Sequence, residues 1–219
     1  MKKFFVILSA ACAIASLEAA PVISDISVEQ NPDTKLVTVS YKLTGEDAVV
    51  TMSLEHNGAA VDGAATSRAF GDVSRRVEAD ASSYKTAYWQ PMDTWANMSI
   101  GANGLKVVLK AWAVTAPPDY MVVTLDEAQT NAVRYYESAA AVPHGVTNRI
   151  YKTDKLVMRK IPAADIQWCM GRNASEEAWA FGDPTLADAE RGHLVTLTAD
   201  YYIGIYEFTQ QQWATLTRS

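Results

Sequence analysis

The stretch VTVSYKL, residues 37–43, alternates apolar and polar side chains and decides the fold class. Alternation with a period of two is typical of a strand that buries one face. The pattern recurs in residues 50–54 and 105–115, and HNG at residues 56–58 is a hairpin-turn signal. We therefore expect a mainly β protein in which residues 20–116 form an immunoglobulin- or fibronectin-like β-sandwich.

Two tryptophans, Trp89 and Trp95, lie on either side of Pro91 within the expected sandwich. One interpretation is an aromatic platform for a sugar ring or a peptide. The other is packing in the core and at the edge of a small sandwich, since tryptophan is highly buried on average in folded proteins. We favour the packing interpretation.

Residues 1–19 have the pattern of a secretory signal peptide. A Lys-Lys pair starts the segment, residues 4–15 are apolar, and cleavage is expected after Ala19. Lipoprotein processing at Cys12 is the alternative. The apolar run is too short to cross a bilayer and no later run approaches the ~18 residues that a membrane span needs. We expect no membrane span and an exported protein, placed in the periplasm, in the cell envelope or outside the cell.

The chain is acidic, with a formal net charge of -6 at pH 7, and its acidic residues are scattered rather than grouped in a block. A surface of this kind repels phosphate groups. We therefore expect neither nucleic acid nor an anionic membrane as a partner.

The cysteines give no catalytic assignment. Once Cys12 leaves with the signal peptide, Cys169 is the remaining thiol and has no partner for an intramolecular disulfide. It stands between Trp168 and Met170 in an apolar run, far from any histidine in sequence, so we interpret it as buried packing rather than as a nucleophile.

The histidines give no metal assignment. His56, His144 and His193 are far apart in sequence and have no ligand-like spacing. We interpret each as a structural or exposed side chain, although spacing alone leaves a three-histidine metal site open. No catalytic, cofactor-binding or metal-ligating residue is assigned from the sequence.

Residues 117–160 are expected to connect two units. The sequence Ala-Pro-Pro-Asp at residues 116–119 is interpreted as a hinge, because consecutive prolines stop both a helix and a central strand. Short strands are expected at residues 120–125 and 155–161. Residues 126–155 receive no regular structure.

The C-terminal residues predict a helix that follows two strands, at residues 193–197 and 201–206. Thr209 is followed three positions later by Gln212, which is the capping-box arrangement. A helix should therefore begin at Gln210 and run to the chain end, with Trp213 and Leu216 on its buried face.

Four short motifs follow one another between residues 161 and 213: Met170-Gly171, Glu190 shortly before His193, Tyr202-Ile203-Gly204, and Glu207-Phe208-Thr209. In this order they resemble the opening of the formylglycine-generating, or sulfatase-modifying factor, domain. The resemblance implies an α+β fold related to C-type lectins for residues 161–219. It also implies that Glu207 and Thr209 are scaffold residues that fix the strand-to-helix turn.

The resemblance further implies a chemistry that is not carried by this chain. Members of the family oxidise a sulfatase cysteine to formylglycine with copper bound by a cysteine pair, and related branches use a histidine-ligated iron. Those ligands follow the opening motif, so no residue here is matched to them. Residues 161–219 are thus expected to be a truncated domain without a cofactor of its own.

These observations lead to two hypotheses of different classes. The first is an exported fragment of a formylglycine-generating-type protein, inactive because the catalytic region is absent. A sulfatase or other protein substrate would be the partner of a full-length protein of this type. The alternative is a non-catalytic envelope or secreted binding module that recognises a glycan or a protein through the sandwich. A structural or adhesive envelope protein is a third possibility.

Overall fold

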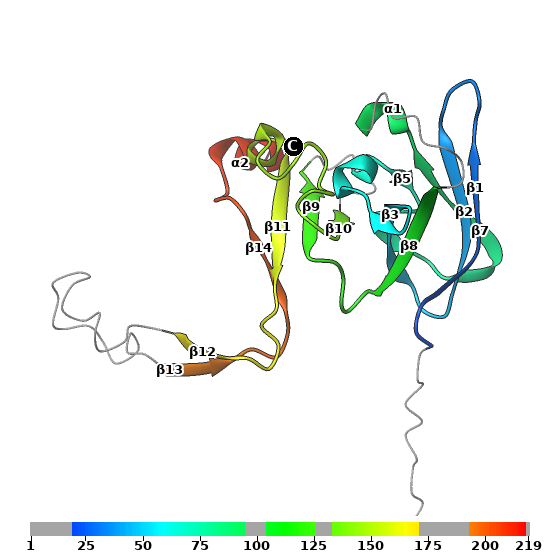
Figure 1. The fold of residues 1–219 in the computed structure, drawn as a ribbon. Helices are drawn as coiled ribbons and strands as arrows, with labels where there is room; N and C mark the ends of the chain where they lie inside the picture. The colour runs from blue at the N-terminus through cyan, green and yellow to red at the C-terminus, as the bar shows by residue number, and fades with distance from the viewer. Residues whose placement is uncertain (1–18, 95–103, 126–132, 171–192, 218–219) are drawn as a thin grey trace, which may run out of the picture.

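The computed structural model describes residues 19–94, 104–125, 133–170 and 193–217, and these residues are mainly β (Figure 1). Every pair of named strands is antiparallel. The expected mainly β class is therefore confirmed. Among the helices in these four ranges, none is long and apolar enough to cross a membrane.

The N-terminal unit contains two antiparallel sheets. The first has the order β1-β2-β7-β5, from β1 (Val22–Gln30), β2 (Val37–Thr44), β7 (Asp80–Trp89) and β5 (Phe70–Gly71). The second has the order β4-β3-β6, with β8 paired to β3, from β4 (Ala59–Ala60), β3 (Ala48–His56), β6 (Arg75–Val77) and β8 (Leu105–Ala113). The strands expected around residues 37–43, 50–54 and 105–115 are confirmed.

The turn between β3 and β4 is the expected hairpin. Asn57 and Gly58 have φ angles of 50° and 80°, and His56 pairs with Ala59 across the turn. Two consecutive residues in the left-handed region are what a type I′ turn requires, and asparagine and glycine tolerate that region best.

The alternation of β2 explains why the two sheets pack face to face. Its buried residues alternate with half-buried ones along the whole strand. The inward residues of β2 share two cores with the inward residues of β3, which face them: Val37, Val39, Tyr41 and Leu43 from β2, and Ala48, Val50, Met52 and Leu54 from β3. Each large aliphatic side chain removed from water contributes ~1.5–3 kcal/mol, so this layer dominates the stability of the unit.

Trp89 belongs to the same core. Its side chain is 2% exposed, and its indole Nε1 donates a hydrogen bond to the carbonyl of Ala65, 2.7 Å away. Ala65 lies in the short helix η1 (Gly63–Thr66), beside α1 (Pro91–Thr94). The packing interpretation is confirmed for Trp89, whereas Trp95 lies outside the described residues.

A second unit follows, built on a sheet with the order β10-β9-β11-β14. Its elements are β9 (Tyr120–Thr124), β10 (Val133–Tyr136), η2 (Arg149–Lys152), β11 (Lys155–Ile161), β14 (Tyr201–Gly204) and α2 (Gln210–Leu216). Its core consists of Val122, Tyr136, Val142, Tyr151 and Val157. The residues expected to act as a connector thus supply three of the four strands, and β14 joins them from beyond residue 160.

A two-stranded arm projects from the β10-β9-β11-β14 sheet of the second unit (Figure 1). We call this sheet the second sheet. The arm consists of β12 (Gln167–Met170) and β13 (His193–Thr196), which pair along their full length. All four residues of β12 are exposed. The strand expected at residues 193–197 is confirmed, and it lies in the arm rather than in the sheet.

The proline pair of the expected hinge is hydrogen-bonded to strands of the second unit. Pro118 is fully buried, the Lys160 ammonium donates to the Pro117 carbonyl at 2.6 Å, and the Tyr202 hydroxyl donates to the Pro118 carbonyl. A second connection lies at β10, where the Tyr135 amide donates to the Ser74 carbonyl at 2.8 Å. Strand β8 ends at Ala113, before the proline pair, and hydrogen bonds from β11 and β14 hold the turn in place.

Candidate functional site

The turn between β14 and α2 carries the motif that the sequence singled out. The Thr209 hydroxyl accepts a hydrogen bond from the Gln212 amide at 3.1 Å, and the Gln212 side-chain oxygen accepts one from the Thr209 amide at 2.8 Å. The predicted capping box and the helix start at Gln210 are therefore confirmed. Thr209 also donates its hydroxyl to the Lys152 carbonyl at 2.7 Å, which joins the turn to η2.

Gln212, rather than Trp213, is the buried residue of α2. It is 1% exposed, and its side-chain nitrogen donates to the carbonyls of Tyr151 at 3.1 Å and Lys155 at 2.7 Å. With the bond from Thr209, all the hydrogen-bonding groups of this amide except one lone pair are used. The helix is therefore fixed to the second sheet by polar bonds.

The expected burial of Trp213 and Leu216 is wrong. Trp213 is 63% exposed and Leu216 is 39% exposed, because the amide of Gln212 turns the neighbouring face of the helix toward the sheet. Trp213 instead packs edge-on against Phe208, with ring centroids 6.5 Å apart. Both aromatic rings remain largely in contact with solvent.

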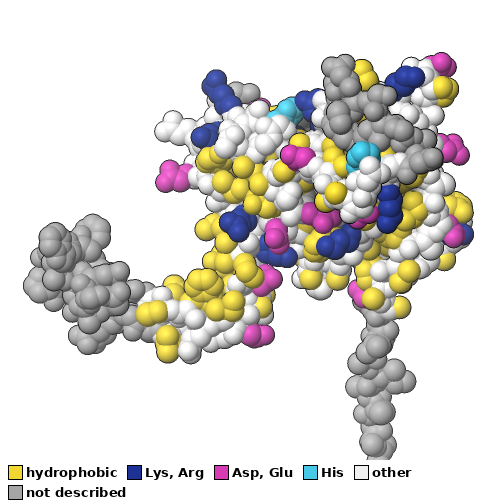
Figure 2. Space-filling model, in the orientation of Figure 1, with side chains coloured by type: hydrophobic (Ala, Val, Ile, Leu, Met, Phe, Trp, Pro, Cys, Tyr) yellow, Lys and Arg dark blue, Asp and Glu magenta, His cyan; other side chains and the backbone are white. Residues whose placement is uncertain are grey.

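Exposed apolar side chains recur through the arm, β14 and α2. Figure 2 shows hydrophobic side chains along the arm and over its junction with the second sheet. We define these residues as the C-terminal apolar surface: Ile166, Trp168, Met170, Leu194, Tyr201, Ile203, Phe208, Trp213 and Leu216. Because paired residues share a face, Trp168 and Leu194 project from opposite faces of the arm, so both faces of the ribbon expose large apolar side chains. Exposed apolar side chains of this size can mark interaction sites.

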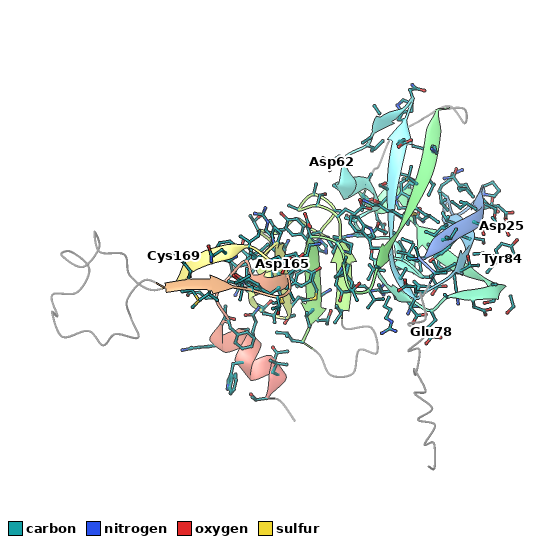
Figure 3. The ribbon with its side chains drawn as sticks, turned by 90° about the horizontal axis from the view of Figure 1, so that it is seen from below. Asp25, Asp62, Glu78, Tyr84, Asp165 and Cys169 are labelled. Atoms are coloured by element: carbon teal, nitrogen blue, oxygen red, sulfur yellow. The ribbon has the colours of Figure 1, made fainter. Side chains whose placement is uncertain are left out.

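Cys169 is exposed, so its interpretation as a buried packing residue is wrong. Its apolar neighbours Trp168 and Met170 are exposed as well, since no described residues form a third layer over the two-stranded arm. Figure 3 shows Cys169 on the arm, at the opposite end of the molecule from Asp25 and Tyr84 of the sandwich.

The structure does not bring the three histidines together in a described site. His56 ends β3 near Asn57, and exposed His144 lies beside the Arg68 guanidinium, with 3.2 Å between Nη2 and Nδ1. His193 begins β13, and its side chain lies outside the described residues. No group of three histidine, cysteine, aspartate or glutamate residues suited to a metal ion occurs in the described part of the chain.

A cavity of about 350 Å³ lies between β3 of the sandwich and β10 of the second unit. Sequence reasoning missed this cavity. We name it the junction pocket. Its lining includes Thr51, Ser53, Thr66, Ser74, Tyr135 and Glu137. One signal was available: Thr51 and Ser53 are polar residues two apart on β3, on the face opposite the core.

A polar network fixes one wall of the junction pocket. Thr51 is 4% exposed, donates its hydroxyl to the Glu137 carboxylate, and accepts a hydrogen bond from the Trp112 indole at 2.9 Å. The Lys110 ammonium lies 3.7 Å from the second carboxylate oxygen of Glu137 and 3.6 Å from the centre of the Trp112 ring. The carboxylate is thus oriented by two groups from the sandwich.

The tyrosines around the junction are neutral. Burial raises the pKa of Tyr136 to about 12, with a smaller opposing effect from Arg134. Burial also raises the pKa of Tyr135. Burial is the main reason that the pKa of Tyr202 is raised, and the nearby Tyr135 and Asp119 raise it further. These phenols therefore act as hydrogen-bonding groups rather than as bases near neutral pH.

Comparison of the chain with protein-family models, with curated proteins and with solved structures gave no match. The resemblance to the formylglycine-generating domain therefore stays a prediction, and the function is argued from the residues themselves.

Proposed function

We propose that this chain is an exported protein whose residues 161–219 have the scaffold of a formylglycine-generating-type domain. The support is the turn at Thr209, which joins η2 and α2 through the hydroxyl that the family resemblance assigns to scaffolding. Tyr202, Ile203 and Gly204 precede it as strand β14. The immunoglobulin- or fibronectin-like sandwich and the lectin-related fold are parts of the same proposal.

The activity that the geometry supports best is binding of a protein by the C-terminal apolar surface. The single observation that carries this proposal is the exposure of Trp168, Leu194 and Ile203 at 41%, 65% and 52%. A two-stranded ribbon is marginally stable alone in water, so a partner that covers the arm would stabilise it. The resemblance makes a sulfatase the first partner to test.

Site-specific photo-crosslinking in the cells that produce the protein tests this function. A photoreactive residue at Leu194 or Ile203 should form a crosslink to one protein species. The same residue at Tyr84, which is 56% exposed on the sandwich, serves as the control. Crosslinks of equal yield at all three positions, or none at Leu194 and Ile203, would rule out a binding role for this surface.

Export is tested separately, by N-terminal sequencing of the protein recovered from the periplasmic or extracellular fraction. A mature sequence that begins at Ala20 supports cleavage after Ala19. Recovery of the uncleaved chain in the cytoplasmic fraction alone would contradict export.

A glycan site at Trp89 receives no support from the fold. The indole is 2% exposed and its N–H is already bonded within the core. A sugar ring stacks only on an accessible aromatic face, so recognition through this residue would require the sandwich to open.

A further inference from the structure

The junction pocket has the composition of a site for a small polar ligand, and it is independent of the C-terminal apolar surface. Its volume of about 350 Å³ falls at the lower end of the range of ligand sites, ~300–1,000 Å³, and such sites are common where two structural units meet. The floor comes from β3 and one wall from β10 and Glu137.

The period-two pattern of β3 places polar groups at the floor. Because Met52 and Leu54 face the sandwich core, Thr51 and Ser53 face the opposite side, which β10 approaches. Lys110 stands directly opposite Thr51 on β8. The outer face of this sheet therefore carries polar residues at Thr51, Ser53 and Lys110, near the point where β10 approaches β3.

The pocket combines an oriented carboxylate with hydroxyls that have no internal task. Thr51 and Lys110 each engage one oxygen of Glu137, and a carboxylate has about four acceptor positions, so capacity remains for a ligand donor. The hydroxyls of Ser53 and Ser74 make no hydrogen bond within the described residues, although Ser74 is only 7% exposed. These hydroxyls can both donate and accept.

The charges select against ionic ligands. The Glu137 carboxylate disfavours an anion, and the Lys110 ammonium disfavours a cation or an amine. The remaining lining includes Ala60, Val61 and the half-buried residue Tyr135, which offer apolar surface. Alternating hydroxyls and C–H faces on a small ring would match both parts of this lining.

We propose that the junction pocket binds a neutral polyhydroxylated ligand, the size of one or two sugar residues, between Glu137 and the hydroxyls of Ser53 and Ser74. Glu137 accepts hydrogen bonds from ligand hydroxyls, and the serines donate or accept as the ligand requires. Thr51 is a positioning residue that holds the carboxylate toward the pocket.

The test is an NMR titration of the full chain with neutral monosaccharides and disaccharides, followed through the backbone amides of Ser53, Ser74 and Glu137. At least one neutral sugar should produce saturable shifts at these amides. Its uronic acid and amino-sugar counterparts should bind more weakly. The proposal is overturned when no neutral sugar gives saturable shifts there, or when a charged counterpart binds more tightly.

Two variants and one control make the site assignment specific. Glu137→Gln should weaken binding by about 10-fold or more, since hydrogen bonds to charged groups are the stronger ones, and Ser53→Ala by about 2–10-fold. The Ser53 hydroxyl has no hydrogen bond to lose within the described fold, so its variant is informative even if Glu137→Gln affects folding. Ser40→Ala, half-buried on the outer face of β2, should bind as the wild type does. Unchanged binding by both pocket variants, or equal loss in the control, would remove the proposal.

Discussion

The side-chain amide of Gln212 donates a hydrogen bond to the carbonyl of Lys155, 2.7 Å away, and thereby attaches α2 to the start of β11. The same nitrogen also reaches the Tyr151 carbonyl. A single polar side chain thus connects α2 to two earlier segments, on a helix whose expected buried residues were Trp213 and Leu216.

Gln212→Ala should destabilise the second unit by about 2–3 kcal/mol, because the carbonyls of Tyr151 and Lys155 and the amide of Thr209 lose their partner while they stay largely buried. Urea unfolding followed by circular dichroism measures this loss. Gln211→Ala is the matched control, since Gln211 is exposed and one position away. A variant at Gln212 that unfolds at the same urea concentration as the control would contradict the anchoring role.

Replacing two of the tryptophans with alanine should lower the free energy of unfolding by very different amounts. Trp89→Ala should cost about 3–5 kcal/mol, since it removes a buried ring and its bond to Ala65. Trp213→Ala should change the free energy of unfolding by less than about 1 kcal/mol, because most of its ring is already in water. Denaturant unfolding of both variants gives the comparison, and a large loss for Trp213→Ala would mean that its ring is covered in solution.

The turn at residues 117–118 should not act as a hinge, so the two units should unfold together. Hydrogen bonds from Lys160 and Tyr202 hold the turn, and the bond from Tyr135 to Ser74 closes the other side of the junction. Differential scanning calorimetry should show one transition whose calorimetric and van't Hoff enthalpies agree. Two separate transitions would show that the units fold independently.

The Asp200 carboxylate should make the base of the arm sensitive to acid. Hydrogen bonds from the backbone amides of Ala164 and Ala163 lower its pKa below the ordinary value of 3.8. A lowered pKa in the folded state means that the stabilisation is present above 3.8 and is lost as the pH falls through the folded-state value. The amide signals of Ala163 and Ala164 should therefore shift in that acidic range.

NMR titration measures this effect. Asp200→Asn retains an oxygen that accepts from the two amides but no longer titrates, so the acidic shift should disappear in that variant. A carboxyl at Asp200 that titrates at 3.8 or above would contradict the prediction.

Local sequence signals predicted the elements whose cause is local. Alternation in residues 37–43 located β2 because one face of that strand is buried by the opposite sheet. Thr209 and Gln212 predicted the start of α2 because both partners of a capping box lie within one helical turn. These patterns contain their own physical explanation.

Other features depend on contacts between distant residues, which no local pattern contains. Thr51 and Glu137 are 86 positions apart and meet only because β10 crosses the outer face of β3. The apolar neighbours of Cys169 predicted a buried side chain, yet it is exposed, and no layer covers it within the described part of the arm. The burial of Gln212 likewise follows from carbonyls that η2 and β11 present to it.

The position of β10 also determines how the second sheet could grow. One side of β10 pairs with β9, and the backbone of its Tyr135 is bonded to Ser74 of the sandwich, whereas β14 has no further strand beside it among the described residues. A sheet that is blocked at one end can add a strand only at the other. The sandwich therefore blocks the β10 edge of this sheet. An added strand can pair with β14, but copies of this sheet cannot pair edge to edge in both directions to form a continuous sheet.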